Sequence, residues 1–207
     1  MGILSEKSPK KFKEESRMRN LKRALSLALA SVMVMGLMVV GTGASYVDVS
    51  SEQNQEAIEV LQAVGVMTGD ENGNFNPDAN VTRNEMAVVM SNLLDYTVSS
   101  YKGTAPFSDV PSWAEPYVAA CYTNGIIAGY DAKTFGGNDS VTTGQAALML
   151  MKALGYFQYA SDFGSDWQLA TTRQGNAIDL FNGVDSGVTQ AMTRNDVAQL
   201  VLNTLEA

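Results

Sequence analysis

The feature that most constrains the fold is a helix start that occurs three times. Thr82-Arg83-Asn84-Glu85 places a threonine three residues before a glutamate, the capping-box pattern that satisfies two N–H groups at a helix N-terminus. Thr193-Arg194-Asn195-Asp196 repeats the pattern, and Thr142-Thr143-Gly144-Gln145 keeps the cap but has Thr143 in place of arginine. Capping does not explain the arginines, because a cation in the first turn opposes the helix dipole.

Other motifs recur around these helix starts. Tyr46-Val47-Asp48-Val49 matches Phe107-Ser108-Asp109-Val110 at an offset of 61, and residues 65–69 match residues 125–129 at an offset of 60. A degenerate third copy follows, in which the loop before the cap is shorter. Self-similarity at a fixed period predicts a repeat architecture. We therefore predict three repeats, over residues 45–100, 101–158 and 159–207.

Each repeat is predicted to contain a short extended segment followed by two helices. The first helices are expected over residues 53–64, 113–124 and 167–179, and the capped second helices over 82–94, 142–154 and 193–205. Gly65 and Gly125 directly follow the first helices, as helix-ending glycines do. A single helix pair cannot bury an apolar face alone, so we expect a mainly α fold in which three helix pairs pack on one another.

Residues 1–44 are predicted to be an N-terminal extension and a secretory signal peptide. Three basic residues between positions 19 and 23 precede an apolar run over 24–40 and a small-residue stretch ending near Ser45. Cleavage is expected after Ala44, which makes contact with the membrane transient. An uncleaved anchor is the alternative, because a run of 17 residues is marginal for a span. Translation from Met18 rather than Met1 is a further hypothesis, because an ordinary signal peptide begins there.

Charge and composition exclude several classes of function. Residues 1–44 carry eight basic and three acidic side chains (+5), and residues 45–207 carry six and 19 (−13), which together give the net charge of −8. An acidic body argues against nucleic-acid binding, which depends on neutralising phosphates. The chain has no histidine, so Ser-His-Asp triads and imidazole metal sites are absent. Cys121, the single cysteine, is predicted to be a small buried hydrophobe.

We predict no catalytic residues, no cofactor and no metal site. No pair of carboxylates has a sequence context that suggests acid–base work on a glycosidic bond. Residues 70–78 place oxygen-bearing side chains at a spacing similar to that of a calcium-binding EF-hand loop. Phe75 and Val81, however, stand where such a loop needs glycine and glutamate. We therefore expect a turn loop there.

The repeat unit resembles the S-layer homology domain. That family has aromatic-x-Asp-Val, Trp-Ala, Gly-Ile-x-x-Gly-Tyr, Gly-x-Phe-x-Pro and Thr-Arg-x-Glu in this order. The matching residues here are Tyr46–Val49, Gly73-Asn74-Phe75-Asn76-Pro77, Thr82–Glu85, Phe107–Val110, Trp113-Ala114, Gly125-Ile126 and Gly129-Tyr130. The resemblance implies a pseudo-threefold, mainly helical spindle that attaches non-covalently to the cell wall of a Gram-positive-type bacterium.

The resemblance also implies a ligand and a site. The family's usual ligand is an anionic secondary cell-wall polysaccharide, often pyruvylated, held in grooves between repeats. Carried over by position, its ligand-binding residues here are Arg83, Arg194, Asp48, Asp109, Trp113, Gly129 and Tyr130. The second copy lacks the arginine, and the third lacks both the aromatic-x-Asp-Val segment and the Gly-x-Phe loop. We therefore expect one or two working grooves.

The residues themselves leave alternatives open at this site. An arginine beside free N–H groups at a helix N-terminus can hold a carboxylate, but Arg83 and Arg194 can equally pair with surface carboxylates. Trp113 can stack on a sugar or pack between repeats, and Asp48 and Asp109 can meet a ligand or organise turns. If the arginines bind ligand, alanine at either position should weaken wall binding without unfolding the protein.

The function predicted from these features is a secreted, non-catalytic module that anchors protein to the bacterial surface through an anionic wall polysaccharide. The alternative is a structural module whose repeats bind other surface-layer proteins in a lattice. The chain ends at Ala207, directly after the third repeat. We therefore expect either a stand-alone wall protein or a truncated member of a longer family.

Overall fold

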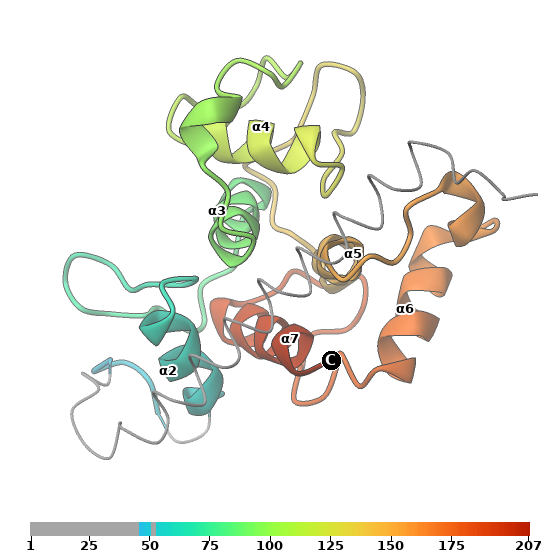
Figure 1. Ribbon diagram of the computed structural model, residues 1–207. Helices are drawn as coiled ribbons and strands as arrows, with labels where there is room; N and C mark the ends of the chain where they lie inside the picture. Colours follow the sequence, from blue (N-terminus) through green and yellow to red (C-terminus); the bar gives the residue numbers. More distant parts are fainter. Residues whose placement is uncertain (1–45, 51–52) are drawn as a thin grey trace, which may run out of the picture.

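The computed structural model describes residues 46–50 and 53–207, in which six α-helices form an inner and an outer tier (Figure 1). The inner helices are α3 (Arg83–Leu93), α5 (Thr143–Ala153) and α7 (Arg194–Glu206), and the outer ones are α2 (Gln55–Ala63), α4 (Glu115–Thr123) and α6 (Trp167–Ala177). Two short 3-10 helices, η1 (Val98–Tyr101) and η2 (Ala160–Phe163), lie in the connectors. All six α-helices begin and end within two residues of the predicted bounds, and the mainly α fold is confirmed. The predicted signal peptide lies outside the described residues.

The inner helices begin as their sequences predict. Thr82 accepts a hydrogen bond from the Glu85 N–H and Glu85 bonds back to the Thr82 N–H, a complete capping box, and Thr142 and Gln145 form a second one. Thr193 caps α7 by accepting from the Asp196 N–H. Capping threonines of this kind contribute about 1 kcal/mol each, so all three helix starts are locally specified.

The three helix starts are joined by a closed ring of backbone bridges. The Val81 N–H donates to the Met192 carbonyl at 3.0 Å, Met192 donates to Val141 at 3.0 Å, and Val141 donates to Val81 at 2.8 Å. All three side chains are buried. Because each repeat contributes one residue and each contacts the other two, the ring gives the molecule a pseudo-threefold axis.

Helices pair between successive repeats. The first helix of the second repeat, α4, packs on α3 of the first, and α6 packs on α5 of the second. The circle closes where α2, near the beginning of the described chain, packs on α7 at its end (Figure 1). A stable unit therefore combines the second helix of one repeat with the first helix and loop of the next, so the repeats interlock.

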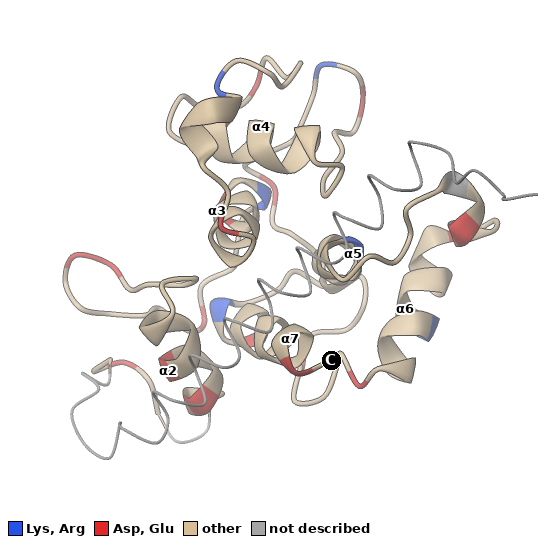
Figure 2. Ribbon diagram, in the orientation of Figure 1, with Lys and Arg blue, Asp and Glu red and all other residues tan. Residues whose placement is uncertain are grey.

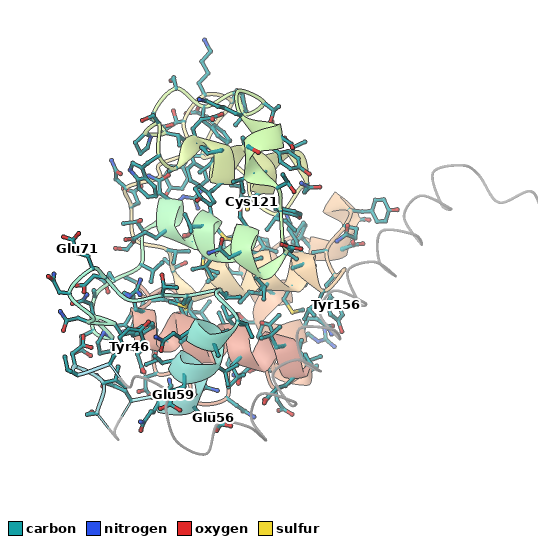
Figure 3. The ribbon with its side chains drawn as sticks, turned by 60° about the vertical axis from the view of Figure 1, so that its left-hand side comes forward. Tyr46, Glu56, Glu59, Glu71, Cys121 and Tyr156 are labelled. Atoms are coloured by element: carbon teal, nitrogen blue, oxygen red, sulfur yellow. The ribbon has the colours of Figure 1, made fainter. Side chains whose placement is uncertain are left out.

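One continuous apolar core fills the space between the tiers. Its largest fully buried side chains come from all three repeats and include Phe75, Met86, Phe135, Leu150, Met192 and Leu200. Cys121 is part of this core, and Figure 3 shows it between α4 and α3. Its burial raises the thiol pKa to about 12, which confirms the interpretation as a small hydrophobe.

The aromatic-x-Asp-Val segments are turns and bends, so the extended conformation predicted for them is wrong. Residues 46–49 close a turn through a hydrogen bond from the Val49 N–H to the Tyr46 carbonyl. The extended pairing lies instead at the three bridges just before the caps. Within the part of the chain that the structure describes, no helix has the length and hydropathy that a membrane crossing requires.

Candidate ligand-binding site

Each inner helix presents its N-terminus to the loop of the next repeat. The N–H groups of Arg83 and Asn84 donate to the Asp139 and Gly137 carbonyls, both at 2.9 Å. The corresponding groups of α5 donate to residues 190 and 188, and those of α7 donate to residues 79 and 77. The expectation of free helix N-terminal N–H groups beside the arginines is therefore wrong, because neighbouring carbonyls already occupy them.

Arg83 connects the first repeat to the second. Its side chain is almost fully buried and donates from Nε to the Phe135 carbonyl at 3.1 Å and from Nη2 to the Ala128 carbonyl at 2.9 Å. The guanidinium carbon lies 4.7 Å from the ring centre of Tyr130 and 4.6 Å from that of Phe135. Burial lowers the pKa of the guanidinium, while the nearby Tyr130, Asp139 and Asp109 act in the opposite direction.

Arg194 makes the equivalent connection from the third repeat to the first. It donates to the Phe75 carbonyl at 2.6 Å and to the Thr68 carbonyl at 2.8 Å, and its guanidinium carbon lies 4.6 Å from the Phe75 ring centre. Burial lowers its pKa, and negative charges on Glu85, Asp48 and Asp70 oppose this shift. Figure 2 shows this cation as the basic start of α7. Both arginines thus stabilise a neighbouring loop through its carbonyls.

Thr143 occupies the same position in the second repeat and makes fewer contacts with the neighbouring loop. Its hydroxyl donates to the Ser186 carbonyl at 3.3 Å, so a short neutral donor replaces the guanidinium. The loop that it meets is the shortened loop of the third repeat, and Asp196 also holds that loop by accepting from the backbone and hydroxyl of Ser186. Among the described residues, the junction between the second and third repeats therefore carries no buried cation.

The two predicted aspartates organise loops. Asp109 accepts hydrogen bonds from the Phe135 and Gly136 N–H groups, both at 2.8 Å. Asp48 accepts from the Phe75 and Asn76 N–H groups at 2.9 and 2.6 Å. The bonds from Phe135 and Gly136 lower the pKa of Asp109. Of the two interpretations left open, turn organisation describes these contacts.

The predicted aromatic residues lie at the surface. Trp113 is 54% exposed and Tyr130 is 55% exposed, so neither ring belongs to the buried core and Trp113 is about half-buried. Burial of part of the ring and a hydrogen bond with Asp139 raise the pKa of Tyr130. Gly129 permits close contact, because a Cβ there would lie 2.4 Å from the Phe107 ring and 2.6 Å from the Thr134 carbonyl oxygen. Arg83, Tyr130 and Asp109 are thereby brought together at one junction.

Sequence reasoning missed several residues of these junctions. Phe75 and Phe135 supply both an aromatic face and a carbonyl to an arginine. Their recurrence at an offset of 60 was the available signal, but it did not identify the partner. Asn195 accepts from the Asn54 N–H at 2.8 Å and so joins the last helix to the start of the first described helix. Among the described residues, no cluster of three histidine, cysteine, aspartate or glutamate side chains is placed to hold a metal ion.

Comparison with known proteins agrees with the repeat assignment in two places. Residues 45–87 and 106–147 match the S-layer homology domain. In both matched stretches the residues run from the aromatic-x-Asp-Val segment through the first helix and the loop to the beginning of the second helix. The shared part therefore contains both loop aspartates, both loop phenylalanines and Arg83.

Three relatives illustrate where such segments occur. The chain is 33% identical over 130 residues to the surface-layer 125 kDa protein of Lysinibacillus sphaericus, and this covers 61% of the chain and 11% of that protein. It is 24% identical over 197 residues to a cell surface protein of Thermoanaerobacter kivui, 91% of the chain and 25% of the relative. It is 34% identical over 102 residues to endo-1,4-beta-xylanase A of Thermoanaerobacterium saccharolyticum, which covers 48% of the chain and 9% of that protein. The matches thus span at most a quarter of these much longer proteins.

Proposed function

We propose that this protein is a secreted, non-catalytic module that attaches to the bacterial cell wall by binding an anionic wall polysaccharide. The observation that carries the proposal is that the chain matches both a protein named for the surface layer and a xylanase, in each case over only a small part of that protein. A segment shared by proteins of such different kinds fits attachment, a task they have in common, better than catalysis.

The geometry supports the junction between the first two repeats as the principal groove. It combines the fixed cation of Arg83 with the half-exposed ring of Tyr130, and the exposed Trp113 lies just before α4 of the same repeat. Aromatic faces suit the apolar face of a sugar, and a desolvated guanidinium suits a carboxylate such as that of a pyruvyl group. Gly129 and Asp109 act indirectly in this proposal, by shaping the loop that carries Tyr130.

The other two junctions are poorer candidates. At the junction between the third and first repeats Arg194 is present, but Asp70 and Gln53 stand where the second repeat has Tyr130 and Trp113. Asp48 organises that loop as Asp109 does the other. The remaining junction has Thr143 and no cation. We therefore infer one strong groove and one weaker groove that Arg194 and Asp48 support.

Long-range electrostatics oppose this binding. Residues 45–207 carry a net −13, and Figure 2 shows acidic positions on outer helices and on loops. The acidic body repels a polyanion, but at physiological salt this repulsion is largely screened beyond a Debye length of about 8 Å, and it weakens further as salt rises. Recognition therefore has to be local, at a junction where cation and rings are fixed in advance.

A wall-retention assay tests the proposal. The full-length chain is incubated with purified wall and with wall from which the secondary polysaccharide has been removed, and retention is measured by sedimentation. We expect retention on intact wall, its loss on stripped wall, and weaker retention of Tyr130→Ala and Trp113→Ala. Tyr159→Ala is the matched control, because Tyr159 is 57% exposed but lies in the third repeat.

Two results would overturn the glycan assignment. Equal retention on intact and stripped wall would mean that peptidoglycan or wall protein is the ligand. The alternative function, assembly with other surface-layer proteins, predicts retention that depends on those proteins and is unchanged by loss of the polysaccharide. The names of the surface-layer relatives are the observation that favours this alternative.

A further inference from the structure

A lysine at the far end of α5 has no counterpart in the other repeats. Lys152 lies in the last turn of this helix, nine residues after Thr143, which corresponds to about 14 Å along the helix axis. Its Nζ donates to the carbonyl of Gly125, the residue that ends the α4 turn, at 3.3 Å. It is therefore remote from the helix starts at which the arginines lie.

The same position in the other repeats shows what the turn itself requires. Asn92 stands ten residues after its capping threonine, as Lys152 and Asn203 do, and donates to the Val66 carbonyl at 3.3 Å. Asn203 donates to the Leu180 and Asn182 carbonyls at 2.8 and 2.7 Å. An asparagine thus satisfies the turn in two repeats out of three. The lysine adds a positive charge that this structural task does not need.

The Lys152 side chain lines a small pocket. A cavity of about 270 Å³ is bounded by Thr123, Asn124, Gly125, Ile126, Lys152, Phe157 and Gln158, and Lys152 is the one charged residue among them. Phe157, one of the lining residues, has a left-handed backbone conformation (φ 53°), and its ring stacks on that of Phe163 at a ring-centre distance of 5.0 Å. The pocket is thus lined mainly by polar groups, with one cation and with Phe157 and Ile126 as its apolar side chains.

The ammonium group is partly desolvated and lacks an acidic partner. Lys152 is half-buried, and burial lowers its pKa below the ordinary value of 10.5. Among the described residues no carboxylate pairs with it, although this part of the chain is strongly acidic overall. A half-buried cation gains most from an ion pair that is also hydrogen-bonded, and two of the three N–H bonds of the ammonium remain beyond the one to Gly125.

We propose that the pocket at Lys152 is a binding site for a small carboxylate, either a free organic acid or the acid group of a single sugar unit. The carboxylate accepts from the Lys152 ammonium, and the rest of the ligand lies against Phe157 and Ile126. The volume is just below the range of about 300–1,000 Å³ typical of drug-sized sites, so it admits a small acid or one sugar. This site is separate from the inter-repeat junctions and does not depend on the function proposed for them.

The test is a titration of the isotopically labelled full-length chain, followed by amide chemical shifts. L-lactate represents a free acid, D-glucuronate an acid sugar, and D-glucose the matched neutral sugar. We expect saturable shifts at Gly125, Ile126 and Gln158 with at least one of the two acids and none with glucose. Lactate binding without glucuronate binding would identify a free acid as the source of the carboxylate, and glucuronate alone would identify a sugar.

Lys152→Asn is the decisive variant, because asparagine at this position already supports the turn in two repeats. It should fold normally and bind the acids at least about tenfold more weakly, as expected for the loss of a charged hydrogen bond. Lys102→Asn, at an exposed lysine, should bind as the unmodified chain does. Absence of saturable shifts with both acids, or equal affinity of Lys152→Asn, would overturn the proposal.

Discussion

Arg194 donates a 2.6 Å hydrogen bond to the carbonyl of Phe75, although 119 residues separate them in the sequence. This bond joins the last helix to the first loop, where α2 also packs on α7. The arginines of the helix starts are therefore part of the fold. Whether or not they also bind a ligand, both arginines hold the loop of the neighbouring repeat in place.

Arg194→Ala should destabilise the protein. It removes donors from the Phe75 and Thr68 carbonyls, and hydrogen bonds from a charged group contribute about 1.5–3 kcal/mol each before solvent screening. Because Arg194 is partly exposed, we expect a total loss of about 2 kcal/mol in the free energy of unfolding, measured by urea denaturation. Arg173→Ala, at an exposed arginine of α6, should change it by less than about 0.5 kcal/mol. Equal stability of the two variants would contradict this role.

The buried contacts of both arginines revise the expectation that alanine at Arg83 or Arg194 weakens wall binding without unfolding the protein. Arg83 is more deeply buried than Arg194 and lies against two rings, so Arg83→Ala should destabilise at least as much. Loss of wall binding in such a variant would not separate a ligand role from a folding role. The exposed Tyr130 and Trp113 are therefore the residues at which binding is tested cleanly.

Asp109→Asn should reduce stability in a pH-dependent way. Hydrogen bonds from the Phe135 and Gly136 N–H groups lower the carboxyl pKa below its ordinary value of 3.8. The unfolded chain then binds the proton more readily, so the stabilisation is complete above about pH 5 and is lost as pH falls through the folded-state pKa. Urea midpoints of the unmodified chain should fall between about pH 5 and pH 2. They should fall less for Asp109→Asn, and an identical pH profile would contradict the assignment.

Gly129→Ala should destabilise through overpacking. The added Cβ would lie 2.4 Å from the Phe107 ring and 2.6 Å from the Thr134 carbonyl oxygen, so ring and loop have to move. Such strain costs about 1–3 kcal/mol, measurable as a lower thermal midpoint. Gly187→Ala is the control, since its Cβ would meet only the flexible end of Gln190 at 3.3 Å. A midpoint unchanged in both variants would mean that the Gly129 contact is not tight.

Cys121 should be chemically inert in the folded protein. Its side chain is fully buried, and burial raises the thiol pKa to about 12, so the reactive thiolate is scarce at neutral pH. Reaction with a chromogenic disulfide reagent should therefore follow global unfolding, and it should be rapid in urea. Fast labelling of the native chain would show that α4 separates from α3 without unfolding.

Local sequence signals predicted the helices and not their partners. Thr82 with Glu85, and Thr142 with Gln145, specify helix starts through contacts three residues apart, and these are confirmed. The pairing of α2 with α7 joins opposite ends of the described part of the chain. A repeat period indicates equivalent units, but it does not say whether a first helix packs within its own repeat or on its neighbour.

The sequence motifs indicated which residues to consider at the candidate site, but they did not indicate the contacts that those residues make. The motif positions lie at inter-repeat junctions, because each helix start meets the loop of the next repeat. That contact is also why the N–H groups beside Arg83 are occupied, which no local pattern reveals. The exposure of Trp113 likewise depends on how α4 lies against α3, a tertiary relationship absent from the sequence.

The most direct measurement is calorimetric titration of the full-length chain with purified wall polysaccharide, before and after chemical removal of its acidic substituents. We predict saturable binding to the intact polymer, loss of that binding once the acid groups are removed, and weaker binding by Tyr130→Ala but not by Tyr159→Ala. Equal affinity for both polymers, or equal affinity of the two tyrosine variants, would contradict recognition of an anionic glycan at the Arg83–Tyr130 junction.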